Sequence, residues 1–311
     1  MNKLLSIIIP AYNEEKNIQP ASTVISDILL KESINYEIIF VDDGSNDNTW
    51  EKITEQSSKN GNIRGISFSR NFGKESAIYA GLTFASGDCC VVIDCDLQHP
   101  PEKIVNMFHL WEEGYEVVEA VKTNRGKEHP LHTLAAKCFY NILSSATQID
   151  MMRASDFKLL DRKAVTVLLN MPEKNSFFRA LSSWIGFKTA QIEFEVLERK
   201  EGTSKWSTKG LIKYAVSNIT SFSTAPMQIV TFLGCIMLIV AFVMGAISLY
   251  QKFLGWALEG FTTVIILLLF TSSMVMISLG IIGYYIAKTY DEIKGRPKFI
   301  VAKTSGNLPG L

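Results

Sequence analysis

Two long segments without a charged residue are the strongest constraint on how this chain folds. Pro226–Tyr250 spans 25 residues and Phe261–Ala287 spans 27 residues, and neither contains Asp, Glu, Lys or Arg. A helix needs about 20 apolar residues to cross a bilayer, and helices in soluble cores rarely run so long without charge. The sequence therefore predicts two transmembrane helices, at 225–250 and 261–287, in contact with a lipid bilayer.

Basic residues flank this pair of segments unequally. Residues 199–214 carry five Lys or Arg side chains and residues 288–303 carry five more, whereas residues 251–260 contain only Lys252. Because basic loops stay on the cytoplasmic side, both chain ends are expected in the cytoplasm. Residues 209–224 are expected to form an amphipathic helix at the interface, although a plain connecting helix fits equally well, and 288–311 a cytosolic tail.

Residues 1–208 have the pattern of a soluble α/β domain. Short β-branched runs alternate with longer helical stretches, and polar turn residues end each run. This alternation predicts a mainly parallel sheet covered by helices on both faces, with ligands at the carboxyl ends of its strands. The expected strands are Leu4–Pro10, Tyr36–Val41, Ile63–Ser67 and Cys89–Ile93, and the expected helices are Ile18–Leu30, Thr49–Ser58, Lys74–Ala85 and Pro101–Glu113.

Charge and cysteine content exclude several classes of protein. Thirty-one basic and 31 acidic residues give a net charge of zero, which argues against a nucleic-acid partner. The five cysteines are odd in number and include no C-x-x-C pair, so neither a disulfide framework nor a zinc cluster is expected, and a reducing compartment fits better. The apolar run Leu4–Ile9 is too short for a signal peptide.

The sharpest chemical motif is Asp94-Cys95-Asp96, directly after the strand at Cys89–Ile93. Carboxylates at the ligand edge of a sheet suit Mg²⁺ or Mn²⁺, which prefer oxygen ligands, and Gln98 offers an amide oxygen. A D-x-D motif often occurs by chance, but its position directly after a buried strand strengthens the case for a cation site here. His99 is better explained as a histidine held beside Pro100-Pro101 than as a metal ligand, since no second histidine or cysteine stands at ligand spacing.

A second polar cluster, Asp42-Asp43-Gly44-Ser45, follows the strand at Tyr36–Val41 and by itself reads as a turn and helix cap. The chain contains no G-x-G-x-x-G and no phosphate loop ending in G-K-S or G-K-T. Dinucleotide oxidoreductase and P-loop ATPase functions therefore lose their main support.

Several motifs occur together in one order along the chain. They are Ser6–Glu14, Asp42–Ser45, Asp94–Pro101, Ser155–Arg162, Glu198–Trp206 and the two C-terminal spans. With these motifs the chain is similar to family 2 glycosyltransferases of the GT-A type and, within them, to polyprenyl-phosphate glycosyltransferases such as dolichol-phosphate mannose synthases and bactoprenol glucosyltransferases. The resemblance covers about residues 3–300. The two spans together with Arg-Asn-Phe-Gly at Arg70–Gly73 resemble the bactoprenol branch most.

The resemblance implies a role for residues around each motif. Asp42 would contact the base, Asp94 the ribose or sugar phosphate, and Asp96 with Gln98 would hold the cation that bridges the diphosphate. Asp156 would lie near the acceptor as an orienting group or weak base, or would simply form a cap or an ion pair with Lys158 or Arg162. The nucleotide-sugar pocket would be lined by Pro10, Ala11, Tyr12, Glu14 and Cys95.

Basic residues would bind phosphates in the same family. Arg199 and Lys205 would meet a phosphate of donor or acceptor, although both also fit as plain flanking charges. Where many relatives carry arginine, this chain has Lys122, which lacks the bidentate fork, and Arg125 could take over its task.

The function implied is inverting transfer of a sugar, foremost glucose from UDP-glucose, onto a polyprenyl phosphate such as undecaprenyl phosphate at the cytosolic face of the inner membrane. Alternatives are a GDP-mannose or modified-sugar donor, and a non-catalytic membrane scaffold that keeps the fold. A processive polysaccharide synthase resembles the chain less, because no Q-x-x-R-W motif is present. The sequence leaves a homo-oligomer open.

Overall fold

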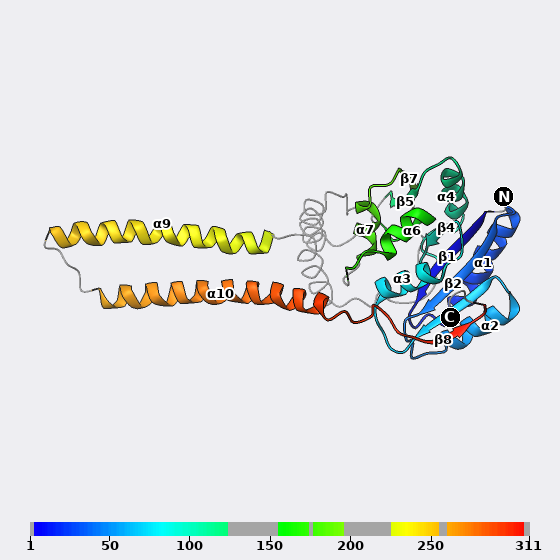
Figure 1. Cartoon of the computed structure of the whole chain (residues 1–311), viewed down its shortest axis with the longest axis horizontal. Helices are drawn as coiled ribbons and strands as arrows, with labels where there is room; N and C mark the ends of the chain where they lie inside the picture. The colour runs from blue at the N-terminus through cyan, green and yellow to red at the C-terminus, as the bar shows by residue number, and fades with distance from the viewer. Residues whose placement is uncertain (1–2, 124–154, 174–176, 196–224, 255–259, 308–311) are drawn as a thin grey trace. The chain divides into compact units, whose positions relative to one another are not determined.

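The computed structural model describes residues 3–123, 155–173, 177–195, 225–254 and 260–307 (Figure 1). The chain forms two compact units. Unit 1 combines residues 1–211 with residues 296–311, and unit 2 is the stretch between them, residues 212–295. The chain therefore leaves unit 1 once and returns to it at its C-terminal end.

Unit 1 is built on an eight-stranded sheet with the order β7-β5-β6-β4-β1-β2-β3-β8. Strands β1, β2, β3 and β4 are mutually parallel, β7 is parallel to β5, and β6 and β8 run antiparallel to their neighbours. The strands are β1 (Leu4–Ala11), β2 (Asn35–Asp42), β3 (Ile63–Phe68), β4 (Cys89–Val92), β5 (Val117–Lys122), β6 (Lys158–Asp161), β7 (Thr189–Phe194) and β8 (Val301–Ser305).

Helices cover both faces of this sheet. Alternate side chains of β1 such as Ile7 and Ile9 join a core with the apolar faces of α1, α2 and α4, because successive strand residues point to opposite faces. On the opposite face α3 lies so close to β1 that a Cβ on Gly81 would overlap the side chain of Ile8. The helices of unit 1 are α1 (Ile18–Lys31), α2 (Thr49–Lys59), α3 (Lys74–Phe84), α4 (Lys103–Glu112), α6 (Arg162–Leu169) and α7 (Phe178–Trp184).

The C-terminal segment 296–307 contributes the edge strand β8. It pairs antiparallel with β3, with Thr304 opposite Ile66 and Ser305 opposite Gly65. From the sequence, residues 288–311 are expected to form a cytosolic tail, and this strand is not predicted. The segment contains a strand because the exposed edge of β3 supplies unpaired backbone groups that a returning chain can satisfy.

Unit 2 contains two long helices, α9 (Ala225–Phe253) and α10 (Phe261–Ile293). Their segments Met227–Ile247 and Leu267–Ile293 are long and apolar enough to cross a membrane. Many of their large apolar side chains are exposed, among them Phe242 at 77% and Met276 at 69%. In water such a surface is costly, whereas in lipid it is the expected one.

The α/β fold class and the mainly parallel sheet predicted from the sequence are confirmed. The four expected strands and four expected helices of the first half all form, with ends that differ from expectation by at most two residues. The predicted amphipathic helix at 209–224 lies outside the described residues.

Candidate active site

The loops after β1 and β2 are joined by a ladder of hydrogen bonds. Asn13 N–H donates to Ser45 Oγ at 2.9 Å, Glu14 N–H donates to Thr49 Oγ1 at 2.8 Å, and Asn46 N–H returns to Asn13 Oδ1 at 2.9 Å. Asn13 has φ = 54°, a left-handed conformation that asparagine tolerates better than most residues. The ladder fixes the two loops at the carboxyl edge of the sheet, where ligands of such sheets bind.

Asp42 and Asp43 at the end of β2 both support the backbone. The Asp42 carboxylate accepts bonds from Ser45 N–H at 3.0 Å and from Ser67 Oγ at 2.7 Å, and its side chain is buried. Asp43 accepts bonds from the N–H groups of Phe72 and Gly73, at 2.6 Å and 2.9 Å. Asp43 therefore holds the loop that leads into α3.

The loop from Ser69 to Gly73 also packs on the turn after β2. Gly44 has φ = 67°, and a Cβ at this position would lie 2.5 Å from the carbonyl carbon of Arg70. Only glycine fits both the conformation and the close approach. The first residue of α3, Lys74, is thereby placed at the ligand edge.

Four charged side chains at this edge of the sheet form a network of ion pairs. Lys74 Nζ lies 2.6 Å from Asp94 Oδ1 and 2.9 Å from Asp156 Oδ2, and Arg179 Nε lies 3.1 Å from Asp156 Oδ1. Asp94 follows β4 and Asp156 precedes β6. Because β6 runs antiparallel to β4, with Lys158 opposite Val92, the start of β6 lies where β4 ends. The sheet topology therefore brings the two carboxylates to one cation.

These ion pairs set the pKa values of the carboxyl groups. Burial acts to raise the pKa of Asp156, but Arg179 and Lys74 outweigh it and hold that pKa well below its usual range. Burial likewise acts to raise the pKa of Asp94, and Lys74 reverses the direction, so its pKa is lowered. Glu75 beside them has its pKa raised to about 7, first by burial and then by the charge of Asp156. Asp94 and Asp156 are thus ionised at neutral pH.

The loop with the expected cation ligands turns sharply between Asp96 and Gln98. Leu97 between them has φ = 55°, which costs a bulky residue about 1–2 kcal/mol. Gln98 N–H donates to Asp96 Oδ1 at 3.2 Å, so the backbone orients the carboxylate. Among the described residues no group of three or more His, Cys, Asp or Glu gathers to hold a metal ion. One carboxylate with one amide fits Mg²⁺ that takes further ligands from substrate phosphates.

The other residues assigned to the nucleotide-sugar pocket divide by burial. Pro10, Tyr12 and Glu14 are half-buried near the end of β1. The side chains of Ala11 and Cys95 pack in the apolar core, and burial raises the pKa of the Cys95 thiol well above its ordinary value. Ala11 and Cys95 can therefore reach a ligand only through their backbones.

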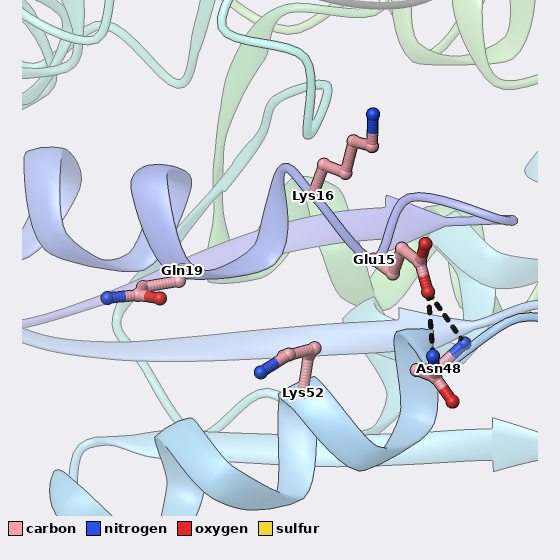
Figure 2. A pocket seen from close by; sticks show the side chains of 5 residues that line it. All are labelled: Glu15, Lys16, Gln19, Asn48 and Lys52. Carbon is pink, nitrogen blue, oxygen red and sulfur yellow. Dashed lines mark hydrogen bonds between the residues drawn. The ribbon is translucent and has the colours of Figure 1, made fainter.

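A pocket also opens between the first turns of α1 and α2 (Figure 2). Glu15 crosses it, accepting bonds from Asn48 N–H at 3.2 Å and Asn48 Nδ2 at 3.0 Å. None of the residues assigned to the active site from the sequence lines it. The lining residues are Glu15, Lys16, Gln19, Asn48 and Lys52.

His99 is a structural residue beside the site. It is buried, stacks on Phe157 with ring centroids 5.3 Å apart, and meets Phe194 edge-on at 5.3 Å. Burial lowers its pKa, so the imidazole is neutral at neutral pH. This agrees with the preference for a packed histidine over a metal ligand.

Basic residues assigned to phosphate binding are only partly described. Lys122 is the half-buried last residue of β5, at the same edge as Asp94 and Asp156. Arg125, Arg199 and Lys205 lie outside the described residues. Asp156 pairs with Lys74 and Arg179, so the alternative of an ion pair with Lys158 or Arg162 was wrong in its partners.

Sequence reasoning missed Lys74, Glu75 and Arg179. The sequence offers one indication for Lys74. A lysine in the first turn of a helix is unfavourable with the helix dipole, so a nearby carboxylate that compensates its charge could have been expected. No comparable signal exists for Arg179, whose partner lies 23 residues away in the sequence.

Comparisons with known proteins show which family the sequence is similar to. Residues 6–169 match the family model described as glycosyl transferase family 2. An uncharacterized glycosyltransferase of Bacillus subtilis is 41% identical over 97% of this chain and 94% of its own length. A prophage bactoprenol glucosyl transferase homolog of Escherichia coli is 35% identical (96% and 98% covered), and the bactoprenol glucosyl transferase of Shigella phage SfII is 33% identical (98% and 99%).

Among solved structures, glucosyl-3-phosphoglycerate synthase of Mycobacterium tuberculosis superposes with a TM-score of 0.49 at 21% identity. The match covers 70% of this chain and 78% of that one.

Proposed function

The chain belongs to glycosyl transferase family 2 and is a glycosyltransferase, and on that premise we propose that it transfers glucose from UDP-glucose to a polyprenyl phosphate. The acceptor proposed is undecaprenyl phosphate, and the product is the polyprenyl-phosphate sugar. The observation that carries the proposal is the near full-length similarity to bactoprenol glucosyl transferases, two apolar helices included.

The two apolar helices support a lipid acceptor. An acceptor with a polyprenyl tail stays in the bilayer, and an enzyme anchored beside it meets its phosphate at the interface. The basic flanks at 199–214 and 288–303 favour the cytoplasmic face of the inner membrane for the catalytic unit.

The donor would bind at the carboxyl edge of the sheet. Pro10, Tyr12 and Glu14 would line the nucleotide pocket, and Asp42 would shape it by holding Ser45 and Ser67. Asp96 and Gln98 would hold a divalent cation, Mg²⁺ or Mn²⁺, which when bound supplies charge stabilisation to the leaving diphosphate.

The acceptor phosphate oxygen attacks the anomeric carbon in line with the departing diphosphate, which inverts that centre. This oxygen is already anionic near neutral pH, so the reaction does not demand a strong general base. The ionised, doubly paired carboxylate of Asp156 agrees with that requirement, because a group with so low a pKa is a poor proton acceptor.

The proposal is tested with membranes that hold the full chain, Mg²⁺, undecaprenyl phosphate and radiolabelled UDP-glucose or GDP-mannose in parallel. We expect label to enter the lipid phase from UDP-glucose. If label enters the lipid phase only from GDP-mannose, the donor is GDP-mannose instead of UDP-glucose, and the proposed transfer to a polyprenyl phosphate still holds. Absence of lipid label from both donors would overturn the proposal.

A variant pair tests the cation ligand in the same assay. Asp96→Asn should lower transfer about 100-fold or more, the size seen when one charge-stabilising group is removed. Asp27→Asn, on the exposed side of α1, is the matched control and should transfer at the wild-type rate. Undiminished transfer by Asp96→Asn would exclude this cation site.

A further inference from the structure

Lys74 is the cation that joins the two halves of the candidate site. Its Nζ contacts Asp94, which the proposed function assigns to the donor, at 2.6 Å, and Asp156, which it assigns to the acceptor, at 2.9 Å. Despite these contacts the side chain is 41% exposed, so part of it remains open to solvent at the ligand edge of the sheet.

The hydrogen-bonding capacity of Lys74 is not exhausted by the two carboxylates. An ammonium group carries three N–H donors, and within the described part of the chain its partners are Asp94 and Asp156. One donor therefore remains for a ligand. The two carboxylates fix the direction of the other two, which orients the third.

Arg179 supplies a second cation on the acceptor side. It contacts Asp156 through Nε, at 3.1 Å from Oδ1, while Lys74 contacts Oδ2. Asp156 therefore holds one cation on each of its oxygens. A carboxylate between two cations is well suited to keep them at a fixed spacing, and two cations at fixed spacing suit a phosphate group.

We propose that Lys74 binds the phosphate of the lipid acceptor, with Asp156 as the positioning residue that holds Lys74 and Arg179 around it. This inference rests on the proposed function, since it names the residue that receives the acceptor of that reaction. The shared chemistry is a phosphate oxygen on an ammonium group, and the donor diphosphate offers the same chemistry. The acceptor is favoured because the Asp96 and Gln98 side already provides for the diphosphate, whereas the Asp156 side carries Lys74 and Arg179.

The proposal predicts that loss of the Lys74 charge changes KM for the lipid acceptor and not KM for the sugar-nucleotide donor. In steady-state transfer with the full chain in membranes, Lys74→Gln should raise KM for undecaprenyl phosphate about tenfold or more, because a charge-assisted contact is lost. KM for the sugar nucleotide should change less than twofold. Lys74→Arg keeps the charge and should recover part of the acceptor affinity.

Lys59→Gln is the matched control. Lys59 is also an exposed lysine 2.6 Å from a carboxylate, Glu55, but it lies on the outer surface of α2. It should leave both KM values at the wild-type level. A rise in the donor KM alone in Lys74→Gln would assign Lys74 to the diphosphate and overturn the proposal, as would unchanged KM values for both substrates.

Direct binding separates failure of this inference from failure of the proposed function. Purified full chain in detergent is titrated with a short-chain polyprenyl phosphate and, separately, with UDP and Mg²⁺. Lys74→Gln should bind the lipid phosphate about tenfold more weakly and UDP as the wild type does. Equal loss of both, with a lower melting temperature, would show a purely structural ion pair. Wild-type binding of lipid phosphate without any sugar transfer would count against the proposed reaction and leave the Lys74 assignment supported.

Discussion

The ring of Phe299 stacks on the ring of Phe68, with centroids 5.3 Å apart and planes inclined by 11°. Phe68 ends β3 near the start of the chain, and Phe299 follows the second apolar helix. Ser69 N–H also donates to the carbonyl of Ile300 at 3.0 Å, and Lys298 lies over the ring of Tyr79 at 4.5 Å. The segment that leaves the second apolar helix is thus fastened to the N-terminal half of unit 1.

Loss of this stacking should destabilise unit 1. We expect Phe299→Ala to lower the free energy of unfolding by about 1–2 kcal/mol, from lost apolar burial and lost ring contact. Thermal unfolding of the detergent-solubilised chain measures this loss as a lower melting temperature. Ile300→Ala is the control, because that side chain is half exposed and its backbone bond to Ser69 is kept. Equal melting temperatures for the two variants would contradict the prediction.

Pairing of β8 with β3 leads to a prediction about membrane topology. On the proposed function α10 spans the membrane, and β8, which follows it closely in the chain, belongs to the sheet of unit 1. We therefore expect the C-terminal end of α10 to lie on the same side of the membrane as the catalytic unit. In intact cells a membrane-impermeant thiol reagent should label Leu254→Cys between the two helices. Lys303→Cys in β8 should be labelled only after the inner membrane is opened, and labelling of both in intact cells would exclude this arrangement.

The contrast between β4 and β8 explains how far the sequence could predict the fold. β4 is a run of apolar residues between turns, and this composition predicts a strand that is buried on both faces, as observed. β8 reads Val-Ala-Lys-Thr-Ser, and its middle residues are exposed, so nothing in its pattern distinguishes it from a tail. Its structure depends on the edge of β3, which is distant in the sequence and is not visible in local periodicity.

The same limit applies to the candidate site. Asp94 and Asp96 could be placed at the ligand edge because they follow a recognisable buried strand. The partners of Asp156 could not, since Lys74 and Arg179 reach it from two helices on either side of it in the chain. The sequence offered Lys158 or Arg162 as a possible partner of Asp156, but the Lys158 side chain is buried and pairs with Glu119.

The buried ion pair between Lys158 and Glu119 should contribute to the stability of unit 1. Lys158 is fully buried, lies 2.6 Å from Glu119, and donates to Ser182 Oγ at 2.9 Å and Ser183 Oγ at 2.8 Å. Removing one partner leaves a buried charge unpaired, so Lys158→Met should cost about 3–5 kcal/mol of stability. Adding Glu119→Gln should restore much of this loss. Additive losses in chemical unfolding of the single and double variants would show that the two side chains do not interact.

Asp43 should make stability depend on pH. Burial raises its pKa to about 6, against the opposing bonds from Phe72 and Gly73. Between pH about 4 and 6 the folded chain keeps a proton on Asp43 that the unfolded chain has lost, so the stability contributed by this group falls as pH rises through that window. Chemical unfolding at several pH values measures the slope.

Asp43→Asn isolates this contribution from other titrating groups such as Glu75. The amide oxygen can still accept the bonds from Phe72 and Gly73, while the side chain no longer ionises. The stability of the variant relative to the wild type should therefore rise from pH 4 to pH 6 and then level off. Asp43→Ala would instead leave two backbone donors without their partner and should destabilise at every pH, by about 1–3 kcal/mol for each donor that stays buried. A difference between Asp43→Asn and wild type that stays constant across the window would mean that Asp43 is ionised in the folded chain throughout.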